Sequence, residues 1–245
     1  SAGDGQVWRC TANCSTPGSA NWVMLGGTNA GSWTNAEEVL TLAAEGNTLY
    51  VGTGITANAD ANVRTCDVSA TCSNTAGWTL LGSSAQWGST KLGVYSIDHN
   101  GSTLYVGVGS NGAGDDEVWR YDGAWTKVGG DNLNSGWNNT HTYARSVLVD
   151  GTTVYAGLQN GAEAYTWKCT NCSTSPNWGG NRIGGKYVNK SWGQSGFDSV
   201  ESSTTVDGKL YIGTGNNTAS DATVWEQDPN NGQWSMIGGQ GINSS

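Results

Sequence analysis

The chain has 245 residues, a formal net charge of −9, an isoelectric point near 4.5 and only 13% charged residues. This negative charge repels phosphate backbones and no Lys or Arg cluster reverses it, so a nucleic-acid partner is excluded. No apolar run approaches the ~18 residues of a membrane helix, so no membrane span is predicted. The 13 Trp and 9 Tyr residues provide enough apolar area for a folded core.

The first predicted elements are two short strands, which begin two series of repeats. We name them strand C and strand D after their place in the repeat described below. Each series recurs five times along the chain, and the Val-Arg-Thr segment at 63–65 is the one strand C without Trp. Strand C comprises residues 7–9, 63–65, 118–120, 166–168 and 224–226, and strand D comprises 22–26, 78–82, 125–129, 178–184 and 234–238.

Two further strands, A and B, follow the first C-D pair and recur four times. Strand B always reads apolar-Tyr-apolar-Gly, and Asn-Gly or Asp-Gly separates it from strand A in three repeats. Such dipeptides between apolar runs indicate β-hairpins. Strand A comprises 39–42, 94–97, 145–148 and 200–203, and strand B comprises 49–52, 104–107, 154–157 and 210–213.

Four short strands in about 50 residues, with recurring Gly and aromatic residues, are typical of a propeller blade. The sequence therefore predicts an all-β chain, a single β-propeller domain over residues 1–245. Four complete four-stranded blades and a C-D half blade at the N-terminus would form a five-bladed ring with one incomplete blade. No segment shows a sustained period of 3.6, so almost no helix is expected.

The repeat layout resembles that of five-bladed propeller lectins in size and blade length. The stretch from Tyr121 to Trp125 also looks like turns in other propeller repeats. This resemblance covers the whole chain and implies architecture, without functional residues.

The last predicted strand D is followed only by a few residues, where a fifth A-B hairpin would be expected. Unpaired strand edges invite another chain. Three explanations stay open: a fragment, an unusual ring closure, or strands supplied by a partner. Self-assembly is therefore one predicted interaction.

The six cysteines fall into three close pairs, which predict three local disulfides in an oxidising compartment. A zinc or redox site at the C-x-x-C of Cys169 and Cys172 is the alternative. A Ser-Ala start without a Met or leader also fits a processed, secreted chain. The predicted pairs are Cys10 with Cys14, Cys66 with Cys72, and Cys169 with Cys172.

Four tryptophans lie in Gly-, Asn- and Ser-rich loops between strand D and the next strand A. An indole face beside amide groups can bind a sugar ring, so these loops are the predicted ligand-binding surface. The alternative is that the indoles wedge neighbouring blades together. The predicted binding residues are Trp33, Trp87, Trp137, Trp192, Asn134 and Asn189.

No cofactor and no metal site are predicted, although three consecutive acids at Asp115, Asp116 and Glu117 leave calcium as an alternative. The alternating ligand spacing of an EF-hand is absent. An acid also stands four residues before the strand C tryptophan position in every repeat, where it is expected to cap the turn from strand B.

These features predict a secreted, non-enzymatic binding protein with lectin-like recognition of carbohydrate by inter-blade loops. Its partner would be a glycan or an extracellular surface. The alternative is a structural or adhesive protein that assembles through its incomplete blade. A third hypothesis is a glycosidase, because several acids lie near the A strands, which are the inner strands of the predicted propeller. These acids are Glu37, Glu38, Asp198 and Glu201. His99 and His141 lie in no recognisable catalytic motif.

Overall fold

The computed structural model describes residues 5–12, 14–15, 21–27, 33, 37–54, 61–70, 72, 77–138, 140–161, 163–192, 197–215 and 222–239. The chain divides into two compact units, residues 1–94 and 95–245, with the boundary inside strand β7. The single domain over residues 1–245 stays a prediction. Within the described residues, no helix is long and apolar enough to cross a membrane.

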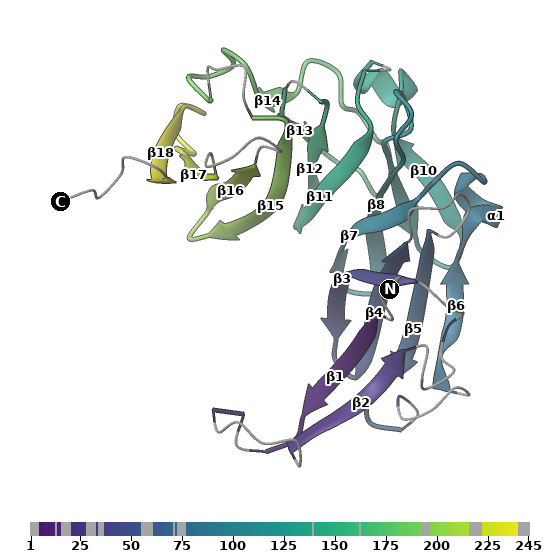
Figure 1. Ribbon diagram of the computed structural model, residues 1–245. Helices are drawn as coiled ribbons and strands as arrows, with labels where there is room; N and C mark the ends of the chain where they lie inside the picture. Colours follow the sequence, from purple (N-terminus) through teal and green to yellow (C-terminus); the bar gives the residue numbers. More distant parts are fainter. Residues whose placement is uncertain are drawn as a thin grey trace. The chain divides into compact units, whose positions relative to one another are not determined.

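The first unit contains an antiparallel pair of strands and then a four-stranded antiparallel set, repeat 1 (Figure 1). The pair is the predicted C-D half of a repeat, and repeat 1 follows the order A, B, C, D. The elements are β1 (Gln6–Cys10), β2 (Trp22–Gly27), β3 (Glu38–Glu45), β4 (Thr48–Gly54), β5 (Asn62–Asp67), β6 (Thr79–Gly82) and α1 (Ser84–Trp87).

The second unit continues with three more sets in the same strand order. The first of these sets begins with β7, the strand that contains the unit boundary. Repeat 2 is β7 (Gly93–Asn100), β8 (Thr103–Gly109), β9 (Glu117–Tyr121) and β10 (Trp125–Gly129). Repeat 3 is β11 (Tyr143–Asp150), β12 (Thr153–Gln159), β13 (Tyr165–Cys169) and β14 (Arg182–Gly184). Repeat 4 is β15 (Ser199–Val206), β16 (Lys209–Gly215), β17 (Thr223–Gln227) and β18 (Trp234–Gly239).

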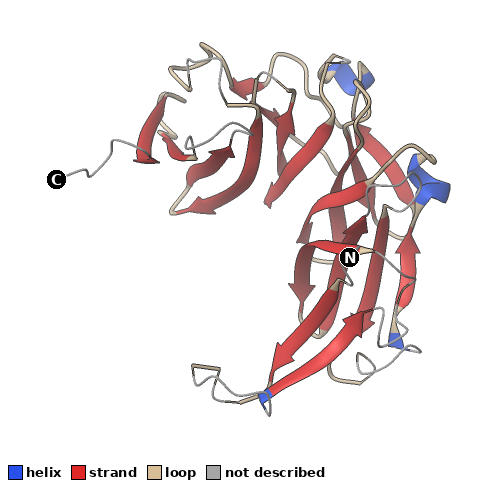
Figure 2. Ribbon diagram, viewed as in Figure 1, coloured by secondary structure: helices blue, strands red, loops and turns tan. Residues whose placement is uncertain are grey.

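The regular structure of the described residues is mostly strand (Figure 2), as the sequence predicts. The predicted hairpin turns are confirmed, since Gly101, Gly151 and Gly208 have positive φ between the A and B strands. α1 is a single turn capped by Ser83 and Gln86, and Leu133–Ser135 forms a short 3-10 turn. One boundary prediction is wrong: β14 begins at Arg182, so Trp178 precedes the strand and packs from a loop.

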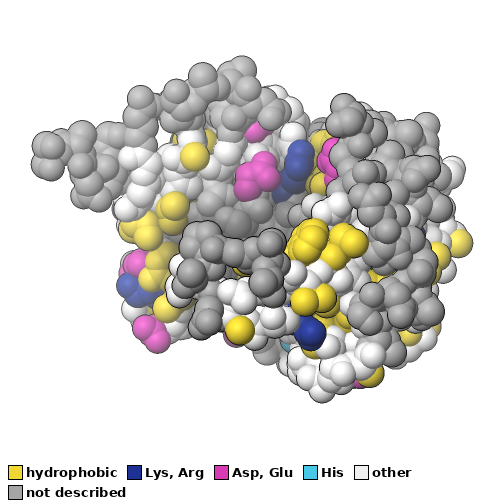
Figure 3. Space-filling model, turned by 60° about the horizontal axis from the view of Figure 1, so that its bottom comes forward, with side chains coloured by type: hydrophobic (Ala, Val, Ile, Leu, Met, Phe, Trp, Pro, Cys, Tyr) yellow, Lys and Arg dark blue, Asp and Glu magenta, His cyan; other side chains and the backbone are white. Residues whose placement is uncertain are grey.

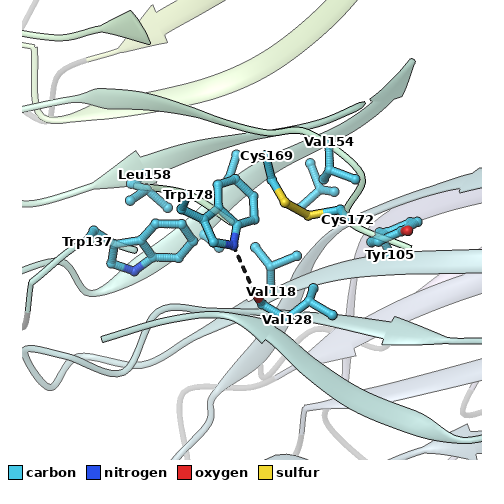
Figure 4. Close-up of a cluster of buried hydrophobic side chains, with 12 residues drawn as sticks. Tyr105, Val118, Val128, Trp137, Val154, Leu158, Cys169, Cys172 and Trp178 are labelled. Atoms are coloured by element: carbon cyan, nitrogen blue, oxygen red, sulfur yellow. Dashed lines mark hydrogen bonds between the residues drawn. A yellow bond between two sulfur atoms is a disulfide. The ribbon is translucent and has the colours of Figure 1, made fainter. Parts of the chain in front are cut away.

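The cores of the second unit are built from tryptophans that join successive repeats. In the cluster of Figure 4, Trp178 donates its indole N–H to the carbonyl of Val128 at 2.9 Å. Trp234 donates to Ile183 at 2.8 Å in the same way, one repeat later. In both cases the strand D region of one repeat contacts strand D of the preceding repeat, which fixes their spacing.

Close packing of a tryptophan also explains the glycine near the end of strand D in repeats 2 and 3. A Cβ on Gly129 would lie 2.9 Å from the ring of Trp137, and one on Gly184 would lie 2.7 Å from the ring of Trp192. Only a residue without a side chain allows the indole to approach the backbone so closely. The Trp-apolar-Gly pattern is thus a signature of contact between repeats.

The three predicted disulfides are confirmed. Cys169 and Cys172 are fully buried in the core of repeat 3, so the C-x-x-C is a structural crosslink here rather than a metal or redox site. Each bond closes a loop directly after a strand C. Disulfides are compatible with an extracellular location.

Candidate functional site

The structure places the four loop tryptophans in the core, where the sequence left a wedge between repeats as the alternative. Trp33 and Trp87 are 5% and 4% exposed, and Trp137 and Trp192 are 1% exposed. Each indole N–H donates to a backbone carbonyl, as Trp192 does to Ala164 at 2.8 Å. In this arrangement no indole face is open to a sugar ring.

The two predicted loop asparagines also have local structural partners. Asn134 donates its side-chain amide to Val128 at 3.0 Å, and Asn189 donates to Ile183 at 3.2 Å. These carbonyls are the ones that accept the indole N–H groups of Trp178 and Trp234. Both asparagines also have positive φ, which is a conformation that Asn tolerates well. Their shared geometry supports the loop between two repeats.

The three consecutive acids in repeat 2 are turned toward different partners. Asp115 accepts a hydrogen bond from Ser110, whereas Glu117 binds Lys127 at 3.0 Å and the indole of Trp119 at 2.8 Å. Within the described residues, no group of three His, Cys, Asp or Glu side chains lies close enough to hold a metal ion. The arrangement thus gives the calcium alternative no ligand set.

The inner strands share a β-bulge near their first residues. The register shifts between Val39 and Thr41 in β3, between Ala144 and Ser146 in β11, and between Val200 and Ser202 in β15. Bulges redirect side chains and are common beside active sites. The bulged residues are Leu40, Arg145 and Glu201.

Arg145 lies against two aromatic rings on the inner strands of repeats 2 and 3. Its guanidinium is 4.6 Å from the ring centre of Tyr143 and 4.8 Å from that of Tyr95, and the two rings meet edge to face at 4.9 Å. Arg145 Nε also donates to Gln159 at 2.6 Å, and the Tyr143 hydroxyl donates to Asn111. Stacking and hydrogen bonds therefore hold a cation in one orientation at the start of β11.

Two carboxylates lie near one serine hydroxyl at the start of β15, the strand that packs beside β11. The Ser199 hydroxyl lies 2.5 Å from a carboxylate oxygen of Glu201 and 3.4 Å from one of Asp198. Asp198 is 6% exposed, whereas Glu201 is an exposed residue. One hydroxyl therefore links a buried and an accessible carboxylate, which is a suitable arrangement for acid-base chemistry.

The other two predicted acids belong to the first unit and differ sharply from each other. Glu37 is 2% exposed. It accepts from Thr53 at 2.7 Å and forms an ion pair with Arg64 at 3.2 Å, so its carboxylate braces the interior of repeat 1. Glu38 is the exposed first residue of β3. Asp198 and Glu201, by contrast, belong to the second unit.

The sequence reasoning missed Arg145, Tyr95 and Tyr143 as site residues. Their signal was a departure from the repeat: the bulge positions carry Leu40 in repeat 1 and Glu201 in repeat 4, so that position is not fixed by packing. On the face drawn in Figure 3, the described charged side chains are few, and acidic and basic ones lie beside one another. That face offers no extended patch of one charge among the side chains described.

Comparison with known proteins gives likeness at the level of structure only. No protein-family model matches the sequence, and no curated protein has a significantly similar sequence. An α-L-arabinofuranosidase of glycoside hydrolase family 43 from Clostridium thermocellum superposes with a TM-score of 0.54 at 14% identity, over 89% of this chain and 78% of that one.

Two other solved structures are similar to this chain. A prolyl oligopeptidase B from Galerina marginata gives a TM-score of 0.56 at 10% identity, over all of this chain but 31% of that one. An exo-β-1,3-galactanase from Clostridium thermocellum gives 0.49 at 13% identity, over 80% of this chain and 47% of that one. The likeness shows a β-propeller-like fold.

These comparisons correct the functional prediction from the sequence. The expectation of a non-enzymatic, lectin-like or adhesive protein is wrong, because the structural neighbours are glycoside hydrolases and other enzymes. The physical reason for the error is that a repeat pattern specifies a fold and not a function, because the same fold carries sites of many kinds.

Proposed function

We propose that this protein is a carbohydrate-active enzyme that hydrolyses glycosidic bonds, with Glu201 as the carboxylate that contacts the substrate. The observation that supports this most directly is the pair of carboxylates joined by Ser199 at the bulge of β15. Hydrolysis of a glycosidic bond requires two carboxyl groups, one that donates a proton and one that acts as a base or nucleophile.

The surroundings of Glu201 support the same role. Arg145 occupies the corresponding bulge of β11 and presents a held guanidinium beside two tyrosine rings. Aromatic rings contact the apolar face of a sugar, and a guanidinium donates to its hydroxyls. In this proposal Arg145 and Tyr143 bind the substrate, while Asp198 and Ser199 position and complete the carboxylate pair.

The fold and the disulfides complete the proposal. The similarity to the arabinofuranosidase extends over most of both chains. In this proposal the repeats are therefore blades of a five-bladed propeller, and β1 and β2 form the outer half of one blade. The proposed enzyme is extracellular, since three disulfides are stable in an oxidising compartment. Its substrate is a neutral glycan, because a chain of net charge −9 repels anionic polymers.

The test is hydrolysis of chromogenic aryl glycosides of arabinofuranose, galactose and xylose, and of the corresponding polysaccharides. Glu201→Gln removes the charge while keeping the shape, and should reduce turnover by about 100-fold or more. Glu226→Gln is the matched control, because Glu226 lies in the same repeat and binds Lys209 and Tyr211. Absence of turnover in the native protein on all substrates, or equal turnover in both variants, would refute the proposal.

A further inference from the structure

A polar pocket lies in repeat 3, and Asn160 in its lining donates its backbone N–H to the carbonyl of Asp198 at 3.0 Å. Its volume is about 260 Å³, and it is formed by the segment that leads into β11, the turn between β12 and β13, and the strands β13 and β14. The lining residues that matter here are His141, Glu163, Tyr165, Trp167 and Arg182. Both aromatic rings and charged groups therefore face one small volume.

The indole of Trp167, in the lining of the pocket, lacks a hydrogen bond that the equivalent tryptophans of other repeats make. Strand C tryptophans elsewhere donate their indole N–H to the side chain two residues earlier: Trp8 to Gln6 at 3.0 Å, Trp119 to Glu117 at 2.8 Å and Trp225 to Thr223 at 2.8 Å. In repeat 3 that position is Tyr165, and the Trp167 N–H is buried without a partner.

The second unusual group is His141, which is 2% exposed. Its Nδ1 lies 3.3 Å from the carbonyl of Asn138. A carbonyl can only accept, so Nδ1 carries the hydrogen. Burial lowers the pKa of His141 to about 4, so the ring is neutral near pH 7 and Nε2 is an acceptor. Nε2 is also buried without a partner.

The same place in repeat 4 shows that packing does not require these residues. The register of the A strands aligns His141 with Phe197, and that of the C strands aligns Tyr165 with Thr223. Phe197 packs against an apolar core cluster, and Thr223 satisfies its neighbouring indole. Repeat 3 thus carries two unsatisfied buried groups that its own fold can avoid, at a cost of stability.

We infer that this pocket is a second saccharide subsite, which binds one neutral sugar unit of the substrate of the proposed enzyme. The unmet groups are a donor, Trp167 N–H, and an acceptor, His141 Nε2. The hydroxyls of a sugar both donate and accept, so one sugar unit can complement a donor and an acceptor, whereas an ionised carboxylate can only accept. Glu163, held by Lys186 at 2.9 Å, and Arg182, 5.0 Å from the ring of Tyr165, supply a further acceptor and donor.

The inference takes its class of ligand, a saccharide, from the proposed function, but its test does not depend on turnover. The intact protein, with ¹⁵N-labelled tryptophan and Glu201→Gln to prevent hydrolysis, is titrated with neutral methyl glycosides of arabinofuranose, galactose and xylose. Methyl glucuronide serves as the charged probe. The readout is the indole N–H resonance of Trp167, identified by its loss in Trp167→Phe.

The expected result is a saturable shift of the Trp167 resonance with at least one neutral glycoside. The Trp225 resonance should not move, because Thr223 already accepts its hydrogen bond. His141→Phe and Tyr165→Gln should each weaken binding by about tenfold or more, which is the loss of one buried hydrogen bond. Two variants are used so that a folding defect in one leaves the other to decide.

Three outcomes overturn the inference: no shift with any neutral glycoside, a shift with glucuronide alone, or binding in both pocket variants that is as tight as in the protein with the intact pocket. Failure of the proposed function is a separate result, namely absence of hydrolysis by the native protein. A protein that hydrolyses glycosides without a Trp167 shift refutes only the subsite. A shift without hydrolysis refutes only the enzymatic proposal.

Discussion

Repeats 3 and 4 have the same strand order and the same bulge, yet their polar residues differ at four equivalent places. The bulge carries Arg145 in one and Glu201 in the other. His141 and Tyr165 stand where repeat 4 has Phe197 and Thr223. Arg182, opposite Trp167, corresponds to Met236, opposite Trp225. The shared positions support the fold, and the differing ones are available for function.

The largest expected effect removes the carboxylate of repeat 4. Glu201→Gln should lower turnover by about 100-fold or more, since a general acid or base contributes about 10²–10⁴. Steady-state kinetics with aryl glycosides measures this. Arg145→Gln, the equivalent change in repeat 3, should chiefly raise KM, because Arg145 is proposed to bind substrate and not to transfer protons. Identical effects of the two changes would remove the distinction between the repeats.

The next largest effect tests what the two repeats share. Trp178→Ala and Trp234→Ala should each lower the free energy of unfolding by about 3–5 kcal/mol, because each deletes a buried indole and its hydrogen bond to the preceding strand D. Denaturant unfolding measures this. Ala substitution of Trp8, which is 48% exposed, is the control and should cost much less. A small loss at either buried position would contradict the packing described.

A smaller effect concerns the indole partner in repeat 4. Thr223→Val keeps the side-chain shape but leaves both the Trp225 N–H and the Thr214 hydroxyl without their partner, and should cost about 1–3 kcal/mol. Thr204→Val, at an exposed position of β15, should change stability by less than about 0.5 kcal/mol. If Thr223→Val is as mild as its control, then an unmet indole is not costly, and the argument for the pocket in repeat 3 weakens.

The last effect, at most about 1.4 kcal/mol for each pH unit, is a pH dependence specific to repeat 3. Burial holds the pKa of His141 at about 4 in the folded chain, below its ordinary value of 6.5. Between these values the unfolded chain binds more protons, so His141 lowers stability as the pH falls through this window, by at most about 1.4 kcal/mol per pH unit. His141→Phe should remove this slope in thermal unfolding, and Phe197→His should create one in repeat 4. Parallel curves for native protein and His141→Phe would contradict it.

Much of the strand pattern could be predicted, but little of the site. Hairpin turns such as Asp150-Gly151 and the disulfide between Cys169 and Cys172 depend on neighbours in sequence, so local chemistry specifies them. The loop tryptophans were ambiguous because an indole in a polar loop suits either a ligand or a core. Burial of Trp137 on all sides depends on the next repeat, which no local pattern encodes.

The sequence by itself determined the order of strands A to D, the turns between A and B, and the pairing of the cysteines, because strand periodicity and turn geometry are short-range properties. Only the tertiary structure decided that the side chains of Asp198 and Glu201 both turn toward Ser199, that Arg145 rests on Tyr95 of the preceding repeat, and that Trp167 and His141 lack partners. A bulge decides where neighbouring side chains of one strand point, and packing between repeats brings distant side chains together, so neither relation follows from spacing in the sequence.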